Sequence, residues 1–163
     1  MDPTQKTFSA NGGGLALNKV SVRVTKRGGA GVLGQACVFD FTNTDAAVNN
    51  NIAGKADSGT SNVRVPVTAD KNNGVPAVLL AACADDALVE VATEGPVTAL
   101  VIKASGNIAA GDPLYHDNAA VGLTADSPGV GAKIVAMSAG AVTGPSTATL
   151  APVILGHFGA AVS

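Results

Sequence analysis

The chain has 163 residues and a net charge of −2 at pH 7, and 47% of its residues are hydrophobic, 3% aromatic and 13% charged. The near-neutral charge argues against nucleic-acid binding through bulk electrostatics. No apolar stretch approaches the ~20 residues of a membrane helix, and the N-terminus lacks the apolar core of a signal peptide. We expect a soluble protein made in a reducing cytoplasm, with a weakly charged surface that favours association.

The first 41 residues predict an arm and two strands. Residues 1–14 are polar and end in three glycines, which is typical of a flexible arm. Residues 19–26 alternate between apolar and polar side chains, the period of a half-buried strand. A glycine-rich turn at residues 28–31 then leads to a second predicted strand over residues 32–41.

A predicted surface loop over residues 43–62, rich in Asn, Asp, Ser and Gly, precedes the next strands. Pro66 interrupts residues 62–68 and indicates an edge strand or a bulge. Residues 77–84 are apolar without a clear period, so a strand and a short helix both remain open. A turn at residues 93–96 is predicted to separate two further strands, over residues 87–92 and 97–103.

The remaining strands are predicted over residues 114–116, 120–124, 133–136 and 147–155. Short runs at even spacing, with 20 Gly and 8 Pro between them, predict an all-β fold, a compact barrel or a sandwich. Cys37 and Cys83 lie far apart in apolar runs, so we expect buried free thiols.

The chain contains an internal repeat. Residues 20–40 match residues 97–117 without a gap at an offset of 77, and Val67-Thr68-Ala69-Asp70 recurs as Leu123-Thr124-Ala125-Asp126. Two copies are too few for a solenoid, so we predict one pseudo-symmetric domain over residues 15–163. Its half-repeats cover about residues 15–95 and 96–163, and the loop over residues 43–62 is an insert in the first.

The order of pieces in the C-terminal half resembles that of the tailed-bacteriophage capsid decoration, or cement, proteins. The resemblance covers roughly residues 87–156. It is carried by a strand ending in glycine over residues 87–95, the segment Ile108-Ala109-Ala110-Gly111-Asp112-Pro113-Leu114-Tyr115, a Thr-rich strand, Val130-Gly131-Ala132-Lys133-Ile134-Val135-Ala136 and a final Val/Leu strand.

The resemblance implies a β-tulip-like barrel that sits as a homotrimer on the outer surface of the virion. It also implies a structural role without cofactor or catalysis, in which the chain bridges subunits of the major capsid protein and stabilises the head. The insert and the arm depart from the family pattern. The family offers no functional side chains to carry over, so the docking residues stay undefined.

The segment Asp57-Ser58-Gly59-Thr60 suggests an alternative, because it matches the catalytic element of aspartic proteases. In a retroviral-type homodimeric protease that aspartate follows an apolar strand, whereas Asp57 follows a polar loop. We therefore predict no enzyme and keep the protease as an alternative. A trimeric β module of a fibre or surface layer is the other alternative.

Lys19, Arg23, Lys26 and Arg27 are the candidate contact residues. We predict that they form a solvated strand face and its turn, and the functional alternative is a contact with the capsid or a neighbouring subunit. The adjacent glycine-rich turn lacks the Gly-Lys-Ser/Thr ending of a phosphate loop. His116 and His157 are the only histidines, too few for a metal cluster without carboxylates at recognisable spacing.

Overall fold

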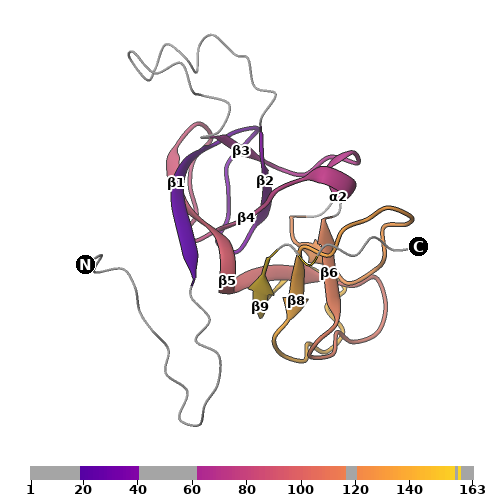
Figure 1. The fold of residues 1–163 in the computed structure, drawn as a ribbon. Coiled ribbons are helices and arrows are strands. Elements are labelled where there is room, and N and C mark those ends of the chain that lie inside the picture. Colours follow the sequence, from indigo (N-terminus) through magenta and orange to yellow (C-terminus); the bar gives the residue numbers. More distant parts are fainter. Residues whose placement is uncertain (1–18, 41–61, 117–120, 157, 159–163) are drawn as a thin grey trace.

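The computed structural model describes residues 19–40, 62–116, 121–156 and 158 (Figure 1). These residues are almost entirely β, which confirms the predicted all-β class. No helix among them is long and apolar enough to cross a membrane. The elements are β1 (Val20–Lys26), β2 (Ala36–Phe39), β3 (Asn62–Arg64), α2 (Asp70–Asn73), β4 (Pro76–Leu79), β5 (Leu88–Ile102), β6 (Pro113–His116), β7 (Leu123–Thr124), β8 (Ala136–Ser138) and β9 (Thr149–Leu155).

The first barrel is closed by β1, β3, β2, β4 and the first half of β5, in that order. β1 and β3 pair in parallel, every other pair is antiparallel, and β1 completes the ring by pairing with β5. Small apolar side chains fill the interior, as the aromatic-poor composition requires. The buried members of this core are Val24, Cys37, Val63, Ala77, Leu79, Val89 and Val91.

The second barrel repeats this topology. The second half of β5 pairs in parallel with β7, and β7, β6, β8 and β9 follow in antiparallel order until β9 returns to β5. Figure 1 shows β5 passing from one barrel to the other. The core of this half includes Ile108, Leu114, Leu123, Val135, Val153 and Leu155.

The turn predicted at residues 93–96 is wrong, because β5 runs through both barrels as one strand. Gly95 has a φ of 87°, which glycine adopts at little cost. Pro96 pairs only with β9, and β7 joins the other side of β5 only from Val101. The missing N–H of the proline therefore faces a side of β5 on which no described strand pairs at this position, and proline is tolerated there.

The internal repeat recurs in the pairing of the strands. Three contacts of the first barrel have counterparts in the second. In each counterpart, one partner lies 77 residues further along the chain, as Ile108 does from Gly31. They are the bridges Gly31–Cys83 and Ile108–Val142, the bonds from the N–H of Gly34 to Leu79 and of Gly111 to Ser138, and the pairs Ala36–Val78 and Pro113–Met137.

The repeat nevertheless contains a gap, contrary to the ungapped match predicted from the sequence. The pattern of buried residues aligns β1 with the second half of β5 at an offset of 75. Val24 and Lys26 of β1 are buried, and so are their counterparts Ala99 and Val101. The loop that follows is therefore two residues longer in the second copy. The predicted match of residues 67–70 with residues 123–126 is also wrong, because residues 123–124 form β7, whose counterpart is β3.

The region around α2 resolves two open expectations. Residues 77–79 of the ambiguous run over residues 77–84 belong to the strand β4, not to a helix. β3 ends at Arg64, two residues before Pro66, in agreement with the predicted interruption. The helix α2 has only four residues, too few for a sequence period to reveal. The predicted arm over residues 1–14 and the insert up to residue 61 lie outside the described residues.

Candidate interaction surface

The turn between β1 and β2 reaches from the first barrel onto the second. The carbonyl of Gly34 accepts a hydrogen bond from the N–H of Leu100 (2.7 Å), and the N–H of Ala36 donates to the carbonyl of Val121 (3.0 Å). Gly34 has a φ of 77°, and a methyl group on its Cα would lie 2.5 Å from Cδ2 of Leu150. Both the backbone angle and the lack of space require glycine here.

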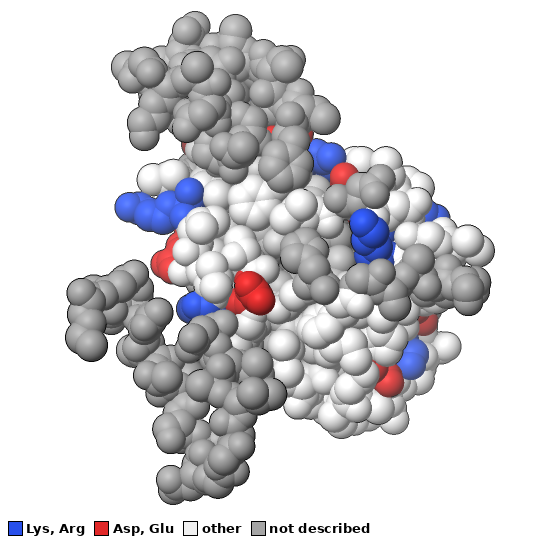
Figure 2. All heavy atoms as spheres, in the orientation of Figure 1, with Lys and Arg blue, Asp and Glu red and all other residues white. Residues whose placement is uncertain are grey.

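This contact brings exposed apolar side chains of the two barrels together. Val32, Leu33, Val121 and Leu150 are 47%, 46%, 43% and 47% exposed, and we name these four residues the junction patch. Apolar side chains exposed as a group mark a surface that binds a partner. On the face drawn in Figure 2, charged side chains are few and scattered among uncharged surface.

The junction patch is not predictable from the sequence pattern. Val32 and Leu33 were assigned to a strand, although the flanking Gly31 and Gly34 indicate that they stand on a turn. Leu150 and Val121 are separated from them by many residues. Only the closing of both barrels around β5 brings the four together.

The segment around α2 is the second link between the barrels. Arg64 donates to both carboxylate oxygens of Asp70, at 2.6 and 3.1 Å, and lies 3.7 Å from Asp40. The Nζ of Lys71 donates to the carbonyl of Pro128 in the second barrel (3.1 Å). The pKa of the Asp70 carboxyl is lowered; burial acts against this, but hydrogen bonds from Arg64 and the Val67 amide outweigh it.

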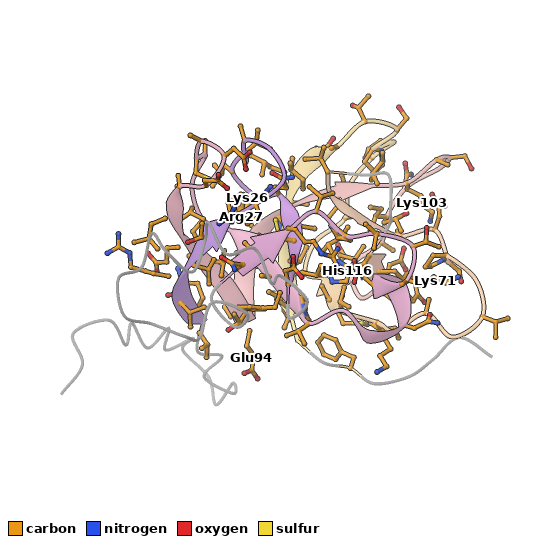
Figure 3. The ribbon with its side chains drawn as sticks, turned by 90° about the horizontal axis from the view of Figure 1, so that it is seen from above. Lys26, Arg27, Lys71, Glu94, Lys103 and His116 are labelled. Atoms are coloured by element: carbon orange, nitrogen blue, oxygen red, sulfur yellow. The ribbon has the colours of Figure 1, made fainter. Side chains whose placement is uncertain are left out.

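His116 lies against this link at the end of β6, and the structure places it inside the molecule. Its side chain is 1% exposed, and neither ring nitrogen has a hydrogen-bond partner. Burial lowers its pKa to about 4, and the nearby Asp70 carboxylate opposes this only in part. The imidazole is therefore neutral at pH 7, and Figure 3 shows it in the interior of the second half.

The four basic candidate residues do not form one surface. Lys19 and Arg23 are exposed, as predicted. Lys26 is 0% exposed, contrary to the prediction, and its Nζ donates to the carbonyls of Arg27 (2.8 Å) and Gly29 (3.0 Å). It closes its own turn instead of contacting solvent. Figure 3 shows Lys26 and Arg27 within the first barrel.

Arg27 is mostly covered and pairs with Asp86 at 3.1 Å. Of the four candidates, Lys19 and Arg23 are therefore the ones available to a partner. The sequence pattern missed the burial of Lys26 because it continues the inward face of β1, where the second barrel has Val101.

Both cysteines are free. Cys37 is buried, and burial raises its pKa to about 12, with Lys26 acting in the opposite direction and Cys83 adding to the rise. A thiol held in its protonated form is a poor nucleophile. Cys83 is only partly buried, which corrects the expectation of two buried thiols.

No group of three or more His, Cys, Asp or Glu side chains that could hold a metal ion occurs within residues 19–40, 62–116, 121–156 and 158. Asp57, the protease candidate, lies outside these ranges. Among the described residues, the junction patch is the candidate interaction surface.

No protein-family model matches the chain, and no curated protein is similar to it.

Proposed function

We propose that the protein is a structural component of a virion that binds the outside of a phage head as a homotrimer. It stabilises the capsid lattice by bridging subunits of the major capsid protein. The junction patch supports this proposal, because it exposes apolar side chains on a closed and sparsely charged body. The assignment to a bacteriophage rests on the sequence resemblance over residues 87–156.

A phage head requires mechanical reinforcement from such a protein. A shell under internal pressure is reinforced by contacts that hold neighbouring subunits together, and no bond has to be made or broken. An oligomer that binds at several points gains affinity through effective concentration, so each contact can be weak. A small apolar patch on a folded barrel can supply one such weak contact.

The test is co-sedimentation with phage heads assembled from purified major capsid protein. We expect the wild-type chain to sediment with the heads at saturable stoichiometry. Leu33→Asp places a carboxylate in the proposed apolar contact, where it would lose water without gaining a partner, so it lowers the affinity by about tenfold or more. Failure of the wild-type chain to bind the heads would overturn the proposal.

Val130→Asp is the matched control, because Val130 is 78% exposed and lies outside the junction patch. It introduces the same charge without touching the proposed contact. If it weakened binding as much as Leu33→Asp, the effect would arise from charge and not from the patch.

A further inference from the structure

Among the described residues, nothing pairs with the outer edge of β1 from Val20 to Val24, which we call the open edge. On one side β1 pairs with β5 from Val20 to Thr25, but on the other side its described partner, β3, begins only at Thr25. The N–H of Lys26 donates to Ala87 across the β5 ladder (3.0 Å). Because the bonding direction alternates along a strand, the amides and carbonyls of Ser21 and Arg23 point to the open edge.

The side chains at this edge are accessible on both faces. Val20 and Val22 continue the inward face of β1, yet they are 43% and 40% exposed because β1 extends past the barrel interior. On the opposite face Arg23 lies beside Glu90 in register, and the hydroxyl of Ser21 donates to the Glu90 carboxylate (2.5 Å). The edge thus carries an apolar face and a face with both signs of charge.

We infer that this edge pairs with the same edge of a second copy of the chain, in antiparallel orientation about a twofold axis at Val22. In this register Ser21 of each copy lies opposite Arg23 of the other. Their outward amides and carbonyls form four hydrogen bonds. Val22 faces Val22, and the exposed valines of the two copies cover one another.

Charge selects this register among the alternatives. Sliding one strand along the other by two residues in one direction would place Arg23 opposite Arg23. Like charges directly opposite each other are destabilising. In the inferred register Arg23 of one copy approaches the Ser21–Glu90 pair of the other, so each cation meets a carboxylate. A self-complementary patch of this kind is what an isologous contact requires.

The contact is short, so it is expected to be weak alone. An edge of five residues buries far less than the ~1,600 Å² of a typical stable interface. Lys19 and Arg23 at the edge disfavour open-ended stacking, which limits assembly to the one matched register. This inference does not depend on the capsid proposal, and its twofold contact is separate from the contacts within a trimer.

The first test traps the contact as a disulfide in a Cys83→Ser background. Val22→Cys would place two thiols at a closely spaced antiparallel pair with Cα atoms ~4.5 Å apart, within the range that a disulfide spans. We expect mild oxidation to link most of this variant into dimers of twice 15.8 kDa. Val130→Cys, at a more exposed valine, is the control and should remain largely monomeric in denaturing gels.

The second test exchanges charges and keeps the inference testable without a disulfide. Arg23→Glu places two carboxylates at each contact, and Glu90→Arg places two cations there, so light scattering should find less self-association of each variant alone. Mixing them restores opposite charges at both ends and should restore association to at least the wild-type level. Equal trapping of the two cysteine variants, or no recovery on mixing, would overturn the inference.

Discussion

Gly34 and Gly111 occupy equivalent turns of the two barrels, with φ angles of 77° and 89°, but their surroundings differ. A methyl group at Gly34 would meet Leu150 and the backbone of Leu100, whereas nothing lies within 4 Å of one at Gly111. The difference arises because only the first turn rests on the neighbouring barrel.

We predict that Gly111→Ala lowers the free energy of unfolding by about 1 kcal/mol, the cost of a left-handed backbone for alanine. Gly34→Ala should lower it by about 2–4 kcal/mol, because crowding adds to the same backbone cost. Urea unfolding of both variants measures this. Equal losses of unfolding free energy in the two variants would show that the turn at Gly34 does not pack against the second barrel.

His116 makes stability depend on pH. Its pKa is about 4 in the folded chain and 6.5 in the reference state, so between these values the unfolded chain binds a proton that the folded chain does not. Stability is therefore complete above pH 6.5 and is lost as the pH falls towards 4. The total loss is about 3 kcal/mol.

His116→Phe tests this cause, since Phe39 holds the equivalent position in the first barrel. The variant should lose less stability than the wild-type chain between pH 6.5 and pH 4, by about 3 kcal/mol. Unfolding curves at a series of pH values measure the difference. Parallel pH profiles of the two proteins would assign the acid sensitivity to other groups.

At the scale of elements, α2 is held by an ion pair and not by helical propensity, because four residues cannot form a stable helix alone. The side chains of Arg64 and Asp70 are 25% and 13% exposed, so removing the cation leaves a mostly buried carboxylate without its main partner. Arg64→Met should lower the free energy of unfolding by about 1–3 kcal/mol.

Amide hydrogen exchange would locate this effect. Protection should fall in α2 and in the facing loop around Pro128 before it falls in β5. Lys133→Met is the control, since Lys133 is an exposed cation nearby and should change stability by no more than about 0.5 kcal/mol. Uniform loss of protection in both barrels would contradict a local role of the pair.

Strands with a clear alternation were predictable from the sequence, and the long β5 was not. The sequence of β1 follows the period of two, and the apolar run of β9 also indicates a strand. The Gly95-Pro96 pair is typical of a turn. Pairing with β1 on one side of it and with β9 on the other nevertheless keeps β5 extended through it. Lys26 was misplaced for a related reason, since two backbone carbonyls satisfy its ammonium group inside the barrel.

At the scale of the whole molecule, the two barrels share β5 in a pseudo-twofold arrangement. β9 ends with Leu155 opposite Gly95, and β1 begins with Val20 opposite Glu94. The sequence repeat predicted the duplication but not the sharing, because a shared strand has no signature in either copy alone. The junction patch was equally beyond the sequence, since it exists only once the copies meet.

The most direct measurement is cryo-electron microscopy of phage heads incubated with the purified chain. The account predicts added density at the local threefold positions of the outer shell, fitted by three copies of the double barrel with their junction patches facing capsid or neighbouring subunits. Heads that remain bare at saturating protein, or density that leaves Val32, Leu33 and Leu150 in solvent, would contradict it.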